Sequence, residues 1–334
     1  MPLSRPLRSG AAGLALALAL LAAAGAAAQS AADLRRVVAA AVDRTAFGNF
    51  VTAAVGFSAL PGVSAADFTI DLDGPGEVEA TRLALPLSRR WEGVEILGGA
   101  PHTELTLAGF RASRAYPVFL PGTPRAARPD ATATSLTAIG GLGLAFPVAE
   151  GTTLAPLVTL GYGRLEDDTT FSGPGARSLD RATRGVLFNV RVEQLIGGPA
   201  LQLDHARGLG GDLRLASRLR ADAVFSDTIS VSDPALEASA ASQVFTARAD
   251  LDGPTGRRAF GRPLRWVLFG AGTAFTGDAA DFIGADAFAE LGGGLALSAA
   301  DLAPELGLAG ASLRASVVVG ADVHGWSVGG RLEF

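Results

Sequence analysis

The chain has three histidines, the residues best suited to act as catalytic bases: His102, His205 and His324. A base must lie within hydrogen-bond reach of the group whose proton it takes. His205 directly follows Asp204, and neighbours in an extended strand point to opposite faces, so these two cannot pair within one strand. His102 has no serine at alternate spacing, and His324 shares a face with Trp326. The pattern favours interfacial or loop histidines, and we expect no catalytic residue and no enzymatic activity.

Two glycine runs could be mistaken for phosphate-binding loops, Gly140-Gly141 and Gly292-Gly293-Gly294. Neither is followed by the Lys-Ser/Thr of a nucleotide loop, and neither opens a helix. Glycine inside a strand more often permits bending or close packing. The sequence also has no cysteine, which excludes disulfides and thiolate metal ligands. We therefore expect no metal site and no cofactor.

Arginines and carboxylates at alternate positions are the remaining residues that could do chemistry. If the strands enclose an interior, the candidate lumen-lining residues are Arg191, Glu193, Arg214, Arg218, Arg220, Asp222, Arg248, Asp250, Arg314, Arg331 and Glu333. Unpaired arginines on such a wall would favour anions. Carboxylates on the same face, Asp204 among them, would instead pair with the arginines across strands and fill the interior. We favour the second interpretation. The net charge of −5 does not indicate a nucleic-acid partner.

These charges alternate with apolar residues, and a period of two predicts β-strands. In 213–225, leucines occupy one face while Arg214, Arg218 and Arg220 occupy the other. The pattern recurs in 184–195, 199–206, 241–251 and 311–320. A soluble sheet with one face in water is the alternative. Segments of about 10 to 13 residues are long for a soluble sheet but fit a tilted strand that crosses a membrane.

The mean hydropathy is +0.32, yet beyond residue 28 the sequence has no run of about 18 apolar residues that could form a spanning helix. In lipid every backbone amide must be paired, so spanning strands must close on themselves. The sequence therefore predicts an all-β fold over 48–334. We expect a closed antiparallel transmembrane β-barrel of about twelve strands, with ten to fourteen allowed. Long connections are predicted near 113–133, 165–183 and 226–240, but their order conflicts with alternating short turns and long loops. At least one predicted strand boundary is therefore wrong.

Residues 1–28 have the three-part pattern of a cleavable signal peptide. Arg5 and Arg8 are followed by an apolar run over 11–24 and by the small-residue motif Ala26-x-Ala28. A permanent membrane anchor is the alternative, but the run has no charged flank behind it. We expect export from the cytoplasm.

Residues 29–47 form a separate segment, in which apolar residues recur at intervals of three and four over 31–46. This spacing predicts an amphipathic helix of about four turns. Two placements remain open: a periplasmic cap on the mouth of the barrel, or a plug inserted into its lumen.

The last residues alternate again, with Trp326, Val328, Leu332 and Phe334 on one face. This segment resembles the terminal strand of bacterial outer-membrane barrels, which ends on an aromatic residue. The resemblance implies that these four residues are the barrel-assembly signal. It also implies two partners during biogenesis, the barrel-assembly machinery and periplasmic chaperones.

A signal peptide, a short helix and alternating strands that end in Arg331-Leu332-Glu333-Phe334 are together similar to the autotransporter β-domain. In that family a barrel of about twelve strands holds a helix in its lumen and exports an amino-terminal passenger. Here nothing lies between signal and helix, and the chain has only two tyrosines for interfacial girdles. We expect a solitary outer-membrane barrel in contact with lipid, serving as a structural or surface component or narrow pore. A small porin-like channel for small solutes is the alternative.

Overall fold

The computed structural model describes most of the chain beyond residue 64, together with six residues near the amino terminus. The described residues are 32, 35, 36, 38–40, 65–71, 77–115, 118–119, 126–283, 286–298, 310–321 and 323–333. The predicted signal peptide lies outside the described residues, as does most of the predicted helix over 31–46.

The described residues form one large sheet with short helical connections. In chain order the elements are β1 (Ala65–Asp71), β2 (Glu77–Arg90), β3 (Ala100–Ala115), β4 (Val118–Phe119), β5 (Ala126–Ala149), β6 (Thr152–Ser172), α4 (Ala176–Thr183), β7 (Arg191–Gly210), β8 (Leu213–Val231), the 3-10 helix η1 (Pro234–Leu236), β9 (Ser239–Ala259), β10 (Arg262–Gly277), α5 (Asp278–Ile283), β11 (Ala287–Ser298), β12 (Gly310–Gly320) and β13 (Val323–Glu333). The all-β prediction is confirmed. No helix among the described residues is long and apolar enough to cross a membrane.

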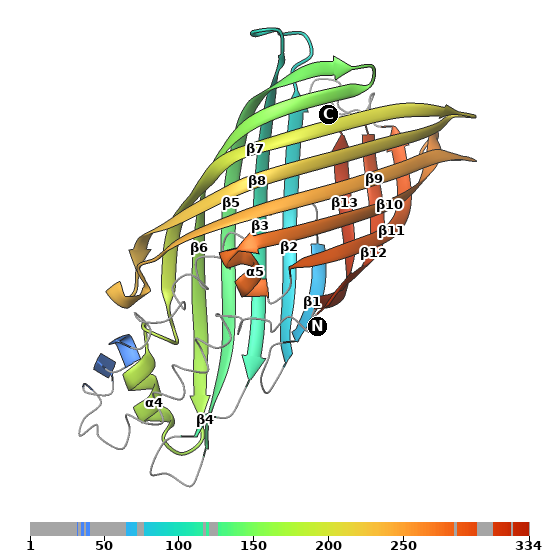
Figure 1. Ribbon diagram of the computed structural model, residues 1–334. Coiled ribbons are helices and arrows are strands. Elements are labelled where there is room, and N and C mark those ends of the chain that lie inside the picture. Colours follow the sequence, from blue (N-terminus) through green and yellow to red (C-terminus); the bar gives the residue numbers. More distant parts are fainter. Residues whose placement is uncertain are drawn as a thin grey trace, which may run out of the picture.

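Every pairing in the sheet is antiparallel, and strands that follow one another in the chain are neighbours, except β3 and the short β4. Two further pairings join strands that are not consecutive. The first joins β1 to β13, with Asp67 opposite Trp326 and Thr69 opposite His324. The second joins β3 to β5 along the whole of β3. Each strand except the short β4 therefore has hydrogen-bonded partners at both edges. The sheet is strongly curled, and β7–β10 run obliquely across β2, β3 and β5 (Figure 1).

Side chains alternate between two environments along the strands, as the sequence predicts. In β12 the burial alternates almost residue by residue, because Ser312, Arg314 and Ser316 are buried while Leu313 and Val317 are exposed. Several strands are longer than expected, and β5 reaches 24 residues.

The segment around Gly197-Gly198-Pro199 is one strand, so the prediction of separate strands over 184–195 and 199–206 is wrong. Residues 184–190 are a connection after α4, and β7 runs without interruption from Arg191 to Gly210. The register with β8 passes from Gly197 opposite Phe225 to Ala200 opposite Asp222, so Pro199 is not needed as a donor to that strand. The glycine and proline signals therefore mark a gap of two residues in the β7–β8 ladder, with the same register on both sides, rather than a turn.

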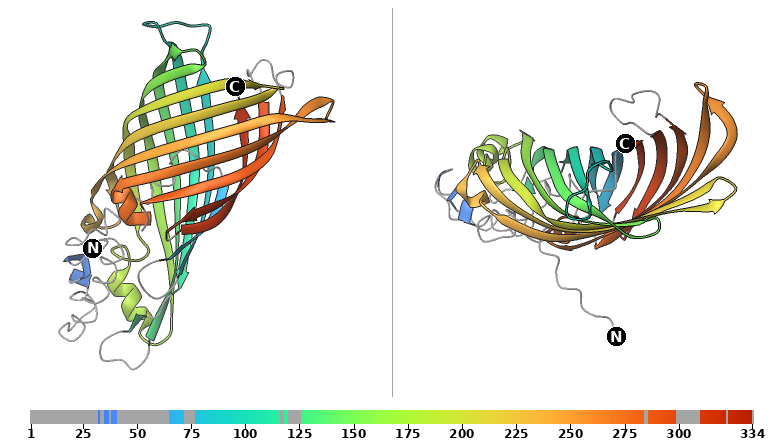
Figure 2. Two further views of the ribbon diagram at one scale, coloured as in Figure 1. Left: turned by 45° about the vertical axis from the view of Figure 1, so that its right-hand side comes forward. Right: turned by 90° about the horizontal axis from the view of Figure 1, so that it is seen from above.

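The two ends of the sheet carry different connections. At one end, here called the turn end, β5–β6, β7–β8 and β9–β10 are joined by two-residue turns at 150–151, 211–212 and 260–261, and the longer β2–β3 and β11–β12 connections over 91–99 and 299–309 lie at this end too. At the other, called the loop end, the connections hold α4, η1 and α5. The three predicted long connections all lie at the loop end, because β7 is a single strand. Figure 2 shows α5 and α4 together at that end, away from the β9–β10 hairpin.

Candidate functional site

The outer face of the sheet is apolar and exposed. Large side chains at alternate positions of neighbouring strands are open to the surroundings, including Leu136, Leu160, Leu291 and Leu313, each 65% exposed or more. Soluble monomers rarely expose contiguous apolar surface of this extent. The outer face therefore fits a hydrocarbon environment.

Charged side chains, in contrast, gather on the inner face, in the half of the interior nearer the turn end. Arg220 of β8 donates from Nη1 to Glu104 Oε2 of β3 at 2.7 Å, and its Nη2 lies 2.9 Å from Asp222 Oδ1. Arg220 and Asp222 are 8% and 7% exposed. Strands β5, β6 and β7 separate β3 from β8 in the sheet. The Glu104–Arg220 contact therefore joins two walls across the interior.

Further polar groups complete this cluster. Arg220 Nη1 also donates to Gln202 Oε1 at 3.2 Å, and His102 Nε2 lies 3.1 Å from Glu104 Oε1. A second contact between the walls joins Arg90, at the end of β2, to Asp204 of β7 at 3.4 Å, and Asp204 also accepts from Arg218 Nε at 2.7 Å. We call His102, Glu104, Gln202, Arg220 and Asp222 the cross-wall cluster.

A second group of charges surrounds one aromatic ring. Asp250 of β9 accepts from Arg248 Nε at 2.9 Å and is also paired with Arg314 of β12. The guanidinium carbons of Arg248 and Arg314 lie 4.2 Å and 5.5 Å from the centroid of Phe269. On neighbouring strands, Glu290 accepts from the Ser316 and Ser327 hydroxyl groups. The arginines on this face are held by carboxylates, as favoured from the sequence.

The half of the interior nearer the loop end is apolar. Its fully or nearly buried side chains come from β3, β7, β9, β10, β11 and β12 and from the connections: Phe110, Val192, Ile196, Val244, Phe275, Phe288, Val318, Leu179 of α4, Leu236 of η1 and Ala279 of α5. Val38, one of the few described residues before β1, is 2% exposed in the same cluster. Arg35 binds Asp233 beside η1 at 2.9 Å. We call this cluster the loop-end core.

Several predicted lumen-lining residues lie where the sequence analysis placed them. Arg218, Arg220, Asp222, Arg248, Asp250 and Arg314 are on the inner face. Arg214 is exposed at the start of β8. Arg331 and Glu333 belong to β13 by backbone, opposite Ser312 and Gly310 of β12, but their side chains are outside the described ones.

The prediction is wrong for Arg191 and Glu193, which lie on the outer face with Leu195. Arg191 Nε binds Glu166 Oε1 of β6 at 2.8 Å, and Glu193 lies 3.8 Å from Arg164 Nη1. The alternation is real, but Val192 and Ile196 point inward to the loop-end core, so the charged positions must point outward.

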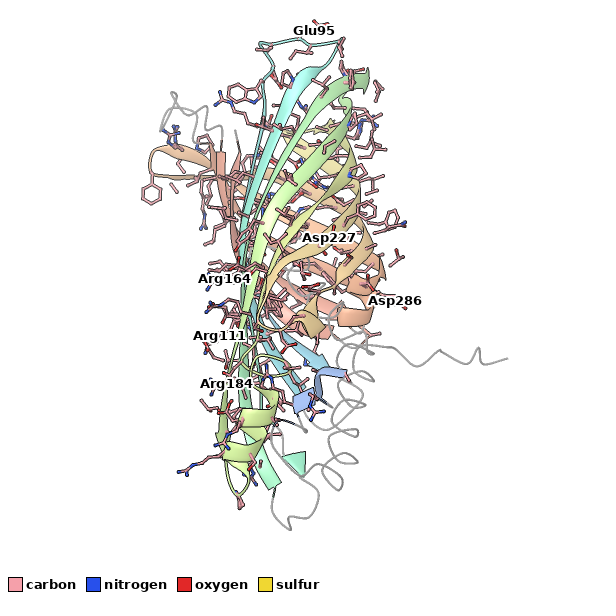
Figure 3. The ribbon with its side chains drawn as sticks, turned by 90° about the vertical axis from the view of Figure 1, so that its left-hand side faces the viewer. Glu95, Arg111, Arg164, Arg184, Asp227 and Asp286 are labelled. Atoms are coloured by element: carbon pink, nitrogen blue, oxygen red, sulfur yellow. The ribbon has the colours of Figure 1, made fainter. Side chains whose placement is uncertain are left out.

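These outer charges mark the edge of the apolar surface toward the loop end. Along β6 the outward residues change from Leu160 to Tyr162 to Arg164, and the next row pairs Glu166 with Arg191 across to β7. In Figure 3 Arg111 and Arg164 lie on the same side of the molecule, well away from the end where Glu95 lies.

The histidines are placed only partly as predicted. His205 and His324 are on the outer face, and Thr152 Oγ1 lies 2.9 Å from His205 Nδ1. His102, however, lies within β3 on the inner face and is 4% exposed, so it is neither an interfacial nor a loop residue. Glu104, Gln202 and Glu290 were missed. The alternation of His102, Glu104 and Thr106 with Thr103 and Leu105 could have placed the first of them. Among the described residues no group of three acidic or histidine side chains is arranged to hold a metal ion.

Of the predicted assembly signal, Trp326 and Val328 are on the outer face, 54% and 42% exposed. The side chain of Leu332 and the whole of Phe334 are outside the described residues.

A scan of family models finds no match to this sequence, and a search of curated proteins finds no relative. Solved structures do match. The β-domain of the Bordetella autotransporter BrkA has a TM-score of 0.45 at 12% identity, covering 81% of this chain and 96% of that one. The structure resembles autotransporter β-domains. The transport unit of AIDA-I from Escherichia coli (TM-score 0.47, 10% identity, 81% and 89% covered) and the translocator domain of NalP from Neisseria meningitidis (0.43, 13%, 85% and 94%) are of the same kind.

Proposed function

We propose that this chain is an integral outer-membrane protein whose strands form a closed barrel of twelve, with β4 outside the ring. The pairing of β1 with β13 and of β3 with β5 supports closure, because no edge of these strands is then left without a partner. A membrane-spanning sheet must have no open edge in hydrocarbon. We place the loop end outward and the turn end toward the periplasm, because long connections of such barrels are extracellular and the connections that hold α4, η1 and α5 lie at the loop end.

The observation that carries the proposal is the sorting of side chains. Leucines stand exposed outside, whereas Arg220, Asp222 and Arg314 are 9% exposed or less inside. A soluble protein has the opposite arrangement, because burying charge is costly and burying apolar surface is favourable. If hydrocarbon surrounds the barrel, its exposed leucines are in an apolar medium, and the buried charges inside are stabilised by pairing with one another.

We further propose that the barrel is filled and acts as a structural or surface component of the autotransporter type. The Glu104–Arg220 contact bridges two walls of the interior at one level, and both side chains are largely buried. Toward the loop end, Phe110, Phe275 and Phe288 occupy the interior. A hydrated solute would have to break both regions to pass.

The test combines folding and conductance. Purified protein refolded into vesicles is expected to migrate as a compact band that shifts on boiling, as barrels do. In planar bilayers, the intact protein is expected to give no large steady conductance. A large steady conductance would support the porin-like alternative instead. Conductance that appears only after deletion of 31–46 would assign the block to that segment rather than to the barrel's own side chains.

A further inference from the structure

The β9–β10 turn differs from the other two-residue turns at the same end in its charge. Arg257, Arg258, Arg262 and Arg265 fall within nine residues, and the sequence has no acidic residue between Asp252 and Asp278. The β5–β6 turn carries Glu150 and the β7–β8 turn carries Asp212. Figure 2 shows the β9–β10 hairpin projecting beyond the strands next to it. The projecting tip is therefore a local concentration of positive charge.

Phe260 at this tip has two independent features, which Leu97 (89% exposed, φ 53°) in the β2–β3 connection at the same end also shows. Phe260 is 92% exposed, the highest exposure among the large apolar side chains of the described residues. It also has a φ of 52°, and Gly261 a φ of 76°, as in a hairpin turn with both central residues in the left-handed region. Such turns favour Asn, Asp or Gly at the first position, and a bulky side chain there is strained. Neither the turn geometry nor packing within the chain explains a phenylalanine at this position. We infer that its side chain contacts an apolar environment outside the protein.

The tip lies directly beyond the apolar belt. Leu268 on the outer face of β10 is 57% exposed, and Phe245 on the outer face of β9, farther from the tip, is 47% exposed. Trp266 shares the outward face of Leu268 and pairs with Gly253. From Trp266 to Arg262 is four residues, or about 13 Å of strand. A tilted strand covers less than that in depth, so the tip reaches the headgroup layer rather than open solvent.

The arginines of this hairpin have two different positions. Arg265 is paired with Asp252 and donates to the Asp212 carbonyl at 2.7 Å, so it fastens the hairpin to the β7–β8 turn. Arg258 donates to the Gly261 carbonyl at 2.6 Å and holds the turn itself. Arg257 is exposed and Arg262 is partly exposed beside Phe260. A rigid base thus carries an exposed tip in which cationic and aromatic groups are adjacent.

We propose that this tip, Arg257–Arg262, is a docking surface for anionic phospholipid headgroups of the leaflet at the turn end. This inference rests on the proposed function. Guanidinium groups bind phosphate through paired hydrogen bonds, and an aromatic ring is favoured at the membrane interface. Cations beside a membrane are attracted to anionic lipid over about one screening length. The exposed Phe260 favours a lipid surface over a soluble acidic protein, because the strands below it already face hydrocarbon.

The experiment uses the absence of cysteine in the sequence to place one fluorescent label. Phe260→Cys carries an environment-sensitive fluorophore, and the full chain is refolded into vesicles of phosphatidylcholine alone or with phosphatidylglycerol. Glu150→Cys, on the β5–β6 turn at the same end, is the matched control. Arg257→Gln/Arg262→Gln in the Phe260→Cys background removes two charges without touching Arg258 or Arg265.

The label at 260 is expected to shift to shorter wavelength in the anionic vesicles, and to lose this shift in about 1 M salt, where the screening length is about 3 Å. The double glutamine variant should lower the ratio of buried to exposed label roughly 25-fold, about fivefold per charge. The label at 150 should not respond to lipid charge. Equal emission at 260 in both lipids, or no effect of the glutamines, would overturn the inference while a heat-shifted band still supports the barrel. Absence of that band would overturn the proposed function, and the inference with it.

Discussion

Two regions of the interior solve the same packing problem with opposite chemistry. Toward the loop end, Phe110, Phe275 and Phe288 meet Leu179 and Leu236 from the connections, as in the core of a soluble protein. Toward the turn end, the cross-wall cluster occupies the interior with one arginine, two carboxylates, an amide and an imidazole. The apolar belt surrounds the turn-end region, whereas the outer side of β6 and β7 beside the loop-end core carries Arg164, Glu166, Arg191 and Glu193. The polarity of the interior therefore does not follow that of the outer face.

The difference lies in how each region responds to change. An apolar core loses stability in proportion to the volume removed, and it tolerates conservative changes. A buried ion cluster is costly to form and is disrupted when one partner is lost, because the other is left charged without a counterion. The ion pairs fix which positions of β3 and β8 face each other, whereas the apolar contacts fix little beyond proximity. We expect the turn-end region to determine which residues of the opposite strands face each other across the interior. We expect the loop-end core to close the opening of the barrel at the loop end.

The largest effect is expected from placing a charge in the loop-end core. Val244 is 0% exposed. Val244→Asp would bury a carboxylate among phenylalanines and is expected to cost more than about 4 kcal/mol, enough to prevent assembly. The measurement is gel migration of the refolded variant, in which the compact band that shifts on boiling is expected to be lost. Val244→Ala is the matched control, with an expected loss of about 2 kcal/mol and a retained barrel. Normal folding of the aspartate variant would mean that water reaches the loop-end region, and the contrast between the regions would then fail.

A smaller effect is expected in the cross-wall cluster. Arg220→Met leaves Glu104 and Asp222 without their cation and should lower the free energy of unfolding by about 3 to 5 kcal/mol. The urea midpoint of the folded band gives the measurement.

The same variant with Glu104→Gln and Asp222→Asn tests the cause of that loss. Removing both orphaned charges should recover most of the stability, since a neutral cluster avoids the cost of unpaired carboxylates. Equal stability of the single and triple variants would show that the carboxylates are hydrated, and the turn-end region would then be an aqueous space rather than a packed one.

Much of the fold follows from the period of the sequence. The alternation in 213–225 and 311–320 predicts both the strands and which residues share a face, because side chains of a strand alternate without exception unless the backbone is irregular. Arg218, Arg220 and Arg314 are found on the inner face for this reason. The pairing of arginines with carboxylates could also be predicted, because the sequence places both residue types on the same face of these strands.

What could not be predicted depends on contacts between distant strands. Alternation separates the residues of a strand into two faces, but it does not show which face is the inner one where both carry apolar residues. For this reason Arg191 and Glu193 were assigned to the inner face, although they lie on the outer face. Val192 and Ile196 point inward because α4 and η1 cover that end, which no local pattern shows. The Glu104–Arg220 pair joins residues 116 positions apart, and its existence depends on the curl of the whole sheet.

The smallest effect is expected on the outer face, where the same pair of groups meets in different surroundings. Arg191 and Glu166 are 59% and 40% exposed, and their Nε–Oε1 distance of 2.8 Å is close to that of Arg220 and Glu104. Arg191→Gln should nevertheless lower the free energy of unfolding by less than about 1 kcal/mol, because exposed ion pairs are screened by water and salt. Urea midpoints at low and high salt give the measurement, and the small loss should vanish at high salt.

A loss comparable to that of Arg220→Met, and insensitive to salt, would contradict this expectation. It would mean that the outer pair is surrounded by hydrocarbon rather than by headgroups and water. The edge of the apolar belt would then lie nearer the loop end than the change from Leu160 to Arg164 along β6 indicates. Geometry alone therefore does not set the strength of these pairs; the medium around them does.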